Sequence, residues 1–314
     1  MNSELNPESA KPRRSLLAPP AGKIDGISAI FWNERELRAG WRLVLFSVLF
    51  AGFMATGLRA LALLQLPHTA SGDITAIGIL SRELVLLAAS LGATAVMAHL
   101  ESRPFGTFGL PGQGASGARF WIGFAWGLAM VTTTILLIWL LKGFSFGDLA
   151  LHGAALAGYG ALWLVVFLSV GLAEESLFRG YPQFTLATGI GFWPAATVIS
   201  ALFAAGHLGN SGEDLAGAAG VFVIAMFFCL TLRRTGNLWF AVGLHASFDW
   251  GETFLFSVPD SGLVAPGHLL NSSFHGPVWL TGGTVGPEAS VMAFVVVGLA
   301  AVIFNRVFPP REGS

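Results

Sequence analysis

The feature that most constrains this chain is a series of apolar runs that recurs along most of its length. A helix needs about 20 mainly apolar residues to cross the hydrocarbon core of a bilayer. A bilayer offers the backbone no hydrogen-bond partners, so such segments fold as helices. The chain is therefore predicted to be an all-α, polytopic membrane protein with about eight spans, at residues 42–66, 74–99, 119–141, 151–179, 191–208, 215–232, 237–257 and 289–306.

The composition agrees with a membrane protein. The 314 residues are 54% hydrophobic and only 11% charged, whereas soluble domains contain about 25% charged residues. A net charge of −1 gives no reason to expect a nucleic-acid partner, so the expected surroundings are the lipid bilayer. The single cysteine, Cys229, excludes an internal disulfide and a zinc site built from cysteines.

The chain divides into three predicted parts. Residues 1–23 are polar and rich in Pro, Ser and basic side chains, which predicts a disordered tail. Residues 24–42 alternate apolar and charged side chains, which predicts an amphipathic helix lying at the membrane interface. Residues 43–308 form the predicted transmembrane domain, with a motif-bearing core at about 160–250.

The distribution of Lys and Arg predicts the orientation. These residues gather in the amino-terminal tail, in the 100–118 loop and at Arg233-Arg234, and they are absent from 67–73 and from 258–288. Cytoplasmic loops are enriched in Lys and Arg. Both termini are therefore expected in the cytoplasm, and the 258–288 loop outside it.

One stretch places charges directly after an apolar run. Glu174, Glu175 and Arg179 follow the apolar residues 162–172. A charge within a membrane helix is costly, so by default it indicates a partner and a function. Glu175 and Arg179 are four residues apart and are expected to pair along the helix. Glu174 is rotated by about 100° from Glu175 and can face elsewhere.

Two later spans carry further polar side chains at helical spacing. Phe203 and His207 are four residues apart, as are His245 and Asp249, so each pair shares a helix face. Asp249 can accept a hydrogen bond from a ring nitrogen of His245, or both side chains can face a common site. A carboxylate with two imidazoles suggests hydrolysis, in which the carboxylate acts as base toward water.

The depth of this site follows from the connection between the fourth and fifth spans. The 188–191 turn makes these spans antiparallel, so Glu174 and His207 should lie at similar depth. Gly180 and Pro182 should break the fourth helix. That break would bring Glu174 nearer the cytoplasmic surface, so the site is expected inside the bilayer toward the cytoplasm.

Charged residues also occur in the first two spans. Arg59 and Glu83 could lie at similar depth and form a structural ion pair. The alternative is that these side chains contact a substrate.

At these residues the chain resembles the CPBP family of intramembrane proteases, which includes type II CAAX prenyl endopeptidases and bacterial Abi-type proteins. The family shows EExxxR, FxxxH and HxxxN or HxxxD in this order on successive membrane helices. All three motifs occur here within residues 160–250. The resemblance also implies a bacterial inner membrane as the location.

The resemblance implies roles for the individual residues. Glu174 and His207 would activate the water, while His245 and Asp249 would bind or stabilise the oxyanion. The catalytic set is thus Glu174, His207, His245 and Asp249, and the supporting set is Glu175, Arg179 and Phe203.

The metal content remains open at this stage, and so does the role of Asp249. Prenyl endopeptidases usually have Asn at this position, and ionised Asp cannot donate to an oxyanion. Asp249 must then be protonated, bind a metal or only orient His245. The family is commonly called metalloprotease, but a metal-free glutamate mechanism is also argued for it. Zinc is the natural candidate for a metal bound by the four catalytic residues. Because this set mixes base and oxyanion roles, however, the prediction leans against a tightly bound metal.

The sequence therefore predicts a membrane-embedded CAAX-type endopeptidase of the metallo or glutamate type. Its substrate would be a membrane-associated peptide or protein, prenylated if it is CAAX-like. Two alternatives stay open. The chain could be a non-catalytic immunity or scaffold protein, or a proton-coupled transporter that uses Glu174 and the histidines as a relay.

The orientation can be tested with a Ser272→Cys variant in intact membranes. Ser272 lies in the 258–288 loop, which lacks Lys and Arg. We expect a membrane-impermeant maleimide to label this cysteine from the non-cytoplasmic side. Labelling from the cytoplasmic side alone would contradict the predicted orientation.

Overall fold

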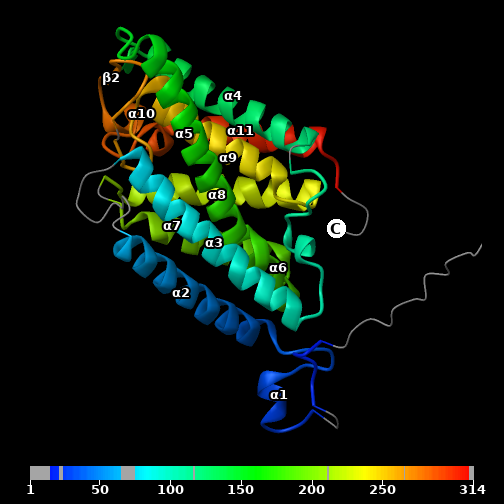
Figure 1. Ribbon diagram of the computed structural model, residues 1–314. Coiled ribbons are helices and arrows are strands. Elements are labelled where there is room, and N and C mark those ends of the chain that lie inside the picture. Colours follow the sequence, from blue (N-terminus) through cyan, green and yellow to red (C-terminus); the bar gives the residue numbers. More distant parts are fainter. Residues whose placement is uncertain are drawn as a thin grey trace, which may run out of the picture.

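The computed structural model describes residues 15–20, 24–64, 75–115, 117–210, 212–264 and 266–310. The long helices pack side by side in one bundle (Figure 1). Its principal helices are α2 (Ala39–Leu63), α3 (Ala76–Leu100), α4 (Ala118–Leu140), α5 (Gly153–Glu174), α6 (Tyr181–Ile190), α7 (Phe192–His207), α8 (Leu215–Thr235), α9 (Trp239–Trp250) and α11 (Val291–Val307). The short elements are α1 (Ser28–Phe31), η2 (Phe105–Phe108), β1 (Phe144–Ser145), η3 (Glu175–Gly180), η4 (Gly251–Phe256), β2 (Ser273–Phe274), α10 (Val278–Thr281) and η5 (Pro287–Ala289).

The helices confirm the predicted all-α, polytopic fold. Five described segments are long and apolar enough to cross a membrane: α2, α3, α4, α8 and the continuous Gly153–Ile190 segment that contains α5 and α6. The α7 and α11 helices are shorter apolar helices, and α9 continues into the π-helical η4. Each predicted span therefore corresponds to a helix. The fourth runs beyond its predicted end at 179, whereas the predicted 67–73 turn lies outside the described residues.

The predicted amphipathic helix over 24–42 is wrong. Only the single turn Ser28–Phe31 is helical before α2 begins. The Asn33 side chain accepts hydrogen bonds from the backbone N–H groups two and three residues later, at 2.9 and 2.8 Å. This Asx-type turn reverses the chain, so that Trp32 and Leu37 form an antiparallel bridge. A local side-chain bond has thus replaced the helix that the alternating pattern predicted.

Part of the tail predicted to be disordered is ordered. Residues 15–20 run along the carboxyl end of α3, where the backbone N–H of Leu16 donates to the Leu100 carbonyl at 2.8 Å. The remainder of the predicted 1–23 tail lies outside the described residues.

The break predicted at Gly180 and Pro182 occurs as a change of helix type. After α5, the residues Glu175–Gly180 form a π-helix before α6 begins. Gly180 has ψ −129°, outside the helical region. Pro182 stands in the first turn of α6, where its missing N–H costs no hydrogen bond. Short π-helical segments are frequent at functional sites.

Close backbone approach fixes α9, which carries two of the predicted site residues, against α4. A Cβ added at Gly123 would lie 2.1 Å from the Phe240 carbonyl oxygen, and one added at Gly243 would lie 2.2 Å from that of Phe120. In membrane proteins, small residues of this kind allow two helix backbones to pack closely. The glycines therefore set the position of α9 within the bundle.

A buried ionic cluster joins the start of α2 to the end of α3 and to α6. The Arg42 guanidinium lies 2.9 Å from the Glu36 carboxylate and 3.3 Å from that of Glu101. Tyr181 donates its hydroxyl to Glu101, and Arg42 donates to Thr188 at 2.7 Å. Because each charge has a partner, this end of the bundle can hold Arg42 almost fully buried.

The two ends of the bundle differ in charge. One end, here called the basic end, carries arginines, namely Arg38, Arg42, Arg103, Arg119, Arg233 and Arg234. The other, the acidic end, consists of the loop residues 141–152, 208–210, 212–214, 257–264 and 266–290, where β1 pairs antiparallel with β2 and α10 packs nearby (Figure 1). Lys142 is the only Lys or Arg in these loops, which contain Asp148, Glu213, Asp214, Asp260 and Glu288. This difference agrees with the predicted orientation, which stays a prediction.

The α4–α9 contact can be tested at Gly127. A Cβ there would lie 2.1 Å from the Ser247 hydroxyl and 2.2 Å from the Leu244 carbonyl oxygen. We expect Gly127→Ala to destabilise the protein by about 1–3 kcal/mol, because the backbones must separate. Thermal unfolding in detergent measures the effect. Gly298→Ala in α11 is the matched control, since no atom lies within 4 Å of its added Cβ. Equal stability of the two variants would contradict the proposed packing.

Candidate active site

The adjacent glutamates Glu174 and Glu175 occupy different environments at the junction of α5 with the π-helix. The Glu175 side chain is fully buried, whereas that of Glu174 is 19% exposed and lines a cavity. The rotation of about 100° between neighbouring helical residues separates the two carboxylates in this way.

The predicted pair between Glu175 and Arg179 is confirmed. The Arg179 Nη1 atom donates to Glu175 Oε1 at 3.1 Å, and both side chains are fully buried. The guanidinium also lies over the rings of Phe203, at 4.3 Å from its centroid, and Phe228, at 5.3 Å. The Nε and Nη2 atoms of Arg179 have no hydrogen-bond partner in the described structure. The two ring faces therefore provide much of the favourable environment of this buried cation.

His245 lies between three carboxylates. Its Nδ1 atom is 3.1 Å from Glu175 Oε1, while its Nε2 atom is 3.5 Å from Glu174 Oε2 and 3.4 Å from Asp249 Oδ2. The Phe228 ring stacks on the imidazole with centroids 5.0 Å apart. Both ring nitrogens thus face acceptor groups, so the cluster needs a proton on each nitrogen or on a neighbouring carboxyl group. The structure therefore favours His245 as a donor toward Glu174 and Asp249.

A close approach of α5 to α9 allows His245 to lie beside the two glutamates. A Cβ added at Gly171 would lie 3.0 Å from the Val242 carbonyl oxygen and 3.5 Å from the Cβ of His245. The absence of a side chain at Gly171 lets His245 approach the glutamates at the end of α5.

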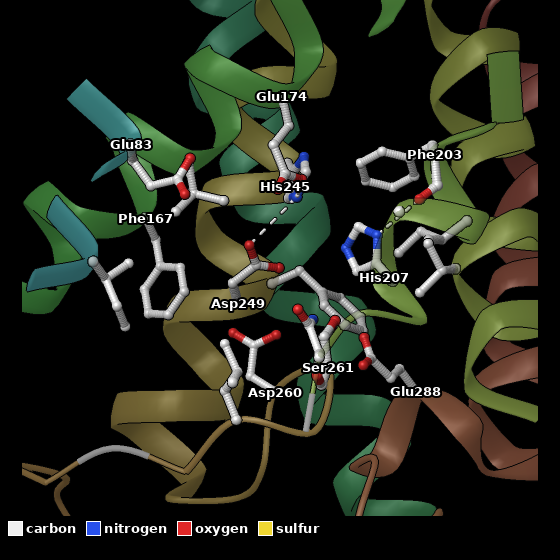
Figure 2. Close-up of a pocket in the computed structure, with 18 of the residues that line it drawn as sticks. Glu83, Phe167, Glu174, Phe203, His207, His245, Asp249, Asp260, Ser261 and Glu288 are labelled. Atoms are coloured by element: carbon white, nitrogen blue, oxygen red, sulfur yellow. Dashed lines mark hydrogen bonds and ion pairs between the residues drawn. The ribbon is translucent and has the colours of Figure 1, made fainter. Parts of the chain in front are cut away.

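His207 is the last residue of α7 and faces the same cavity from another side (Figure 2). Its Nδ1 atom lies 2.9 Å from the backbone carbonyl oxygen of Phe203, to which it donates as Nδ1–H. The Nε2 atom of the neutral ring is then free to accept a hydrogen bond. The Phe203 ring packs edge-on against the imidazole at 4.5 Å. Phe203 therefore holds both the Arg179 guanidinium and the His207 ring.

The predicted catalytic residues share one cavity of about 480 Å³. Glu174, His207, His245 and Asp249 all line it. One part of its wall is apolar and comes from α3, α5 and η3, through Ile79, Leu86, Trp163, Phe167, Val170 and Leu177. The sequence motifs thus locate four side chains that the fold brings to a common space, although their catalytic roles stay predictions.

Glu83 on α3 also lines the cavity (Figure 2). The predicted ion pair between Arg59 and Glu83 is wrong within the described residues, where Glu83 has no ion pair and its Oε2 atom has no hydrogen-bond partner. Depth alone suggested the pair, but the Glu83 side chain points into the cavity that Glu174 lines. The position of Glu83 in the cavity wall favours the alternative, a contact with substrate.

Loop residues of the acidic end line part of the cavity, whereas the sequence suggested a site toward the cytoplasm. The α7 helix starts near the basic end, where the Arg233 guanidinium lies 4.8 Å from the Phe192 ring centroid. His207 stands at its other end, roughly 22 Å away at ~1.5 Å per residue. The loop residues Asn210, Asp260 and Ser261 complete the lining. The expected position of the site toward the cytoplasm stays a prediction, as does the orientation of the bundle.

The sequence analysis did not identify Asp260 and Glu288, two acidic loop residues that line the cavity. Burial raises the pKa of Asp260 to about 6, and burial with the nearby Asp260 charge raises the pKa of Glu288 to about 8. No motif marks these residues, because they are distant in sequence and only the folded loops bring them to the cavity.

The predicted zinc ligands do not fit a zinc site as they are arranged. A ligating histidine must present an unprotonated nitrogen to the metal. In His245, Nδ1 faces Glu175 and Nε2 faces the carboxylates of Glu174 and Asp249. Within the described residues, no three of the four predicted residues offer ligand atoms that all lie within 4.8 Å of one another.

The comparison with protein families supports the motif assignment. Residues 157–251 match the family of type II CAAX prenyl endopeptidases described as Rce1-like. This segment extends from α5 to the end of α9 and contains every predicted site residue. The match confirms the resemblance that the motifs indicate, and at the level of the family it implies a membrane-embedded protease of the CAAX type. No curated protein and no solved structure matches the chain.

The different environments of the two glutamates predict different effects on stability. Glu175→Gln leaves the Arg179 cation buried without a charged partner, which should destabilise the protein by about 3–5 kcal/mol. Glu174→Gln should change stability little, because Glu174 lines the cavity and is partly exposed. Thermal unfolding of both variants in detergent compares them. A larger loss of stability in Glu174→Gln would contradict the assignment.

Proposed function

We propose that this chain is an intramembrane endopeptidase in which Glu174 activates a water molecule for attack on a peptide carbonyl. The observation that carries the proposal is that Glu174 and His207 line one cavity on different sides of it, with His245 behind Glu174 and anchored by Glu175. A water in that cavity can contact a carboxylate base and an imidazole acceptor together.

The first step is removal of a proton from water. Glu174 is the base, and His207 orients the water through Nε2, because its Nδ1–H is engaged with the Phe203 carbonyl. The resulting hydroxide attacks the carbonyl carbon, and the carbonyl π electrons move to oxygen. The base lies in the cavity next to the apolar part of its wall.

The oxyanion formed in this step needs a donor. His245 supplies Nε2–H when its ring carries a proton on both nitrogens, with Nδ1–H donating to Glu175 and Nε2 facing the carboxylates of Glu174 and Asp249. Asp249 lies 3.4 Å from the same Nε2 atom. That contact supports the option in which Asp249 orients His245, so the absence of the usual Asn removes no donor from the proposed mechanism.

The second step breaks the carbon–nitrogen bond. The oxyanion electrons return to form the carbonyl, and the protonated Glu174 gives its proton to the leaving amine. This transfer returns Glu174 to its carboxylate form, and the products are an amine and a carboxylic acid that loses its proton to water.

The cavity wall supports a membrane-associated substrate with an apolar group. The side chains of Ile79, Leu86 and Phe167 form part of an apolar surface next to the carboxylates. This surface can hold an apolar side chain or the prenyl group of a CAAX-like peptide. Because loop residues of the acidic end line part of the cavity, we infer that the scissile segment enters from there.

The catalytic role of Glu174 can be tested by measuring hydrolysis of quenched fluorescent peptides in proteoliposomes. Removal of a general base costs about 10²–10⁴-fold in rate, so Glu174→Gln should lower kcat by at least about 100-fold. Asp148→Asn, an exposed acidic residue of the acidic end, is the control and should keep wild-type activity. Near wild-type turnover of Glu174→Gln would contradict the mechanism. Absence of any hydrolysis by the wild type would favour the non-catalytic alternative.

The substrate class can be tested with paired peptides that differ only in a farnesyl group. If the apolar wall binds the prenyl chain, the farnesylated peptide should show the higher kcat/KM, and Leu86→Ala should reduce that preference several-fold without changing hydrolysis of the unmodified peptide. Equal kcat/KM values for the two peptides would show that the wall does not recognise the prenyl group.

We further propose that hydrolysis needs no zinc, because the ligand atoms of Glu174, His207, His245 and Asp249 do not converge within 4.8 Å of one another in the described structure. Activity should persist in 1,10-phenanthroline, and elemental analysis of the active protein should find less than one zinc per chain. Stoichiometric zinc that is lost together with activity, and restored with it, would contradict this proposal.

A further inference from the structure

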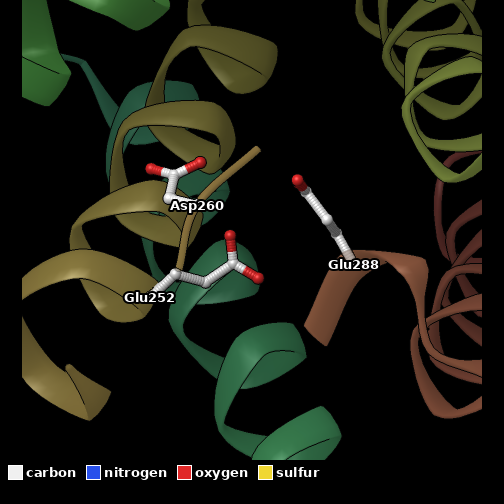
Figure 3. Close-up of side chains that lie close together, drawn as sticks. All are labelled: Glu252, Asp260 and Glu288. Atoms are coloured by element: carbon white, nitrogen blue, oxygen red, sulfur yellow. The ribbon is translucent and has the colours of Figure 1, made fainter. Parts of the chain in front are cut away.

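Three carboxylates from separate segments converge beside the cavity. They belong to Glu252 in η4, Asp260 in the following loop and Glu288 in η5. One oxygen of each lies within 4.8 Å of the others, and Figure 3 shows the three side chains directed toward a common space. None of the proposed catalytic residues belongs to this group.

Glu252 is the feature that distinguishes this group from a solvated acidic patch. The residue is 0% exposed. Both of its carboxylate oxygens are buried without any hydrogen-bond partner, and so is Oε1 of Glu288. A buried carboxylate without a partner is strongly disfavoured. Within the described residues, no basic side chain compensates Glu252.

The neighbouring contacts explain why Asp260 can join the group. The Thr253 hydroxyl donates to Asp260 Oδ2 at 3.1 Å, which fixes the carboxylate next to Glu252. The backbone N–H of Val258 donates to the Glu252 carbonyl at 3.0 Å and turns the chain sharply after η4. The turn therefore brings Asp260 back over the helix that carries Glu252.

We propose that Glu252, Asp260 and Glu288 bind a divalent cation of the hard class, Ca²⁺ or Mg²⁺. The three ligands are carboxylate oxygens, which these cations prefer, and the group contains no imidazole or thiolate that would favour zinc. A bound cation supplies the partner that the buried Glu252 lacks.

The cation would act on the shape of the part of the cavity that Asp260 and Glu288 line. Asp260 and Glu288 also line the cavity, and Glu252 lies three residues after Asp249 along the same helical segment. Binding would therefore fasten the 257–263 loop and η5 to the end of α9. This role is structural and does not depend on the proposed hydrolysis.

Full-length protein in detergent, stripped with EDTA, provides the test. Addition of CaCl₂ or MgCl₂ should raise Tm of the wild type saturably, on the order of several degrees. Tb³⁺ is a luminescent probe for Ca²⁺ sites and can be excited through the ten tryptophans of the chain. We expect Tb³⁺ luminescence that Ca²⁺ displaces.

Glu252→Gln should remove both the cation-dependent rise of Tm and the Tb³⁺ signal. Without a cation, this variant should melt above the stripped wild type, because one of three mutually repelling carboxylates is gone. Glu288→Gln serves as a second variant if Glu252→Gln does not fold. Asp148→Asn, outside the group at the same end, should keep the wild-type response.

Two results would overturn the proposal. The first is a wild type whose Tm does not respond to millimolar Ca²⁺ or Mg²⁺. That result would indicate that the three carboxyl groups share protons and bind no cation. The second is an equal cation response in the wild type and in both Gln variants. Neither result depends on protease activity, so failure of this proposal is distinguishable from failure of the proposed function.

Discussion

The arrangement of this molecule depends on the need to compensate buried charge in a largely apolar chain. Arg179 and Glu175 are both fully buried and lie 3.1 Å apart. The same Glu175 oxygen contacts His245. The ring of Phe203 packs on Arg179, and the backbone carbonyl of Phe203 accepts a hydrogen bond from His207. Removing one member would leave another unpaired in a low-dielectric environment, which is costly. The pair therefore fixes the relative positions of α5, α7 and α9, and with them the side chains at the cavity.

This dependence gives Glu175 a second role that its spacing did not reveal. Helical periodicity predicted a partner for Glu175 four residues later, and it correctly separated Glu175 from Glu174. Periodicity along one helix contains no information about its contacts with another helix. The contact between Glu175 and His245 was therefore not predicted, although it decides which nitrogen of His245 faces Glu174 and Asp249. Glu175 is a positioning residue as well as a structural one.

The sequence was most informative where one physical rule dominates. Apolar length determined the helices, and short motifs within them identified four residues that line one cavity. It failed where two local effects compete, as at Asn33, whose side chain bonds the following backbone and prevents the predicted amphipathic helix. It also missed Glu252, Asp260 and Glu288, because these residues meet only after the loops of the acidic end have folded. Equal depth suggested a partner for Glu83 but could not show that Glu83 faces the cavity.

The central claim is that Glu174, His207 and His245 act on one reacting carbonyl. An experimental structure with a peptide analogue, in which a tetrahedral phosphonate replaces the scissile amide, tests this claim most directly. The mechanism predicts one phosphonate oxygen at hydrogen-bond distance, about 2.7–3.1 Å, from His245 Nε2, and a second oxygen between the Glu174 carboxylate and His207 Nε2. A phosphonate that binds in the cavity but contacts neither Glu174 nor His245 would contradict it.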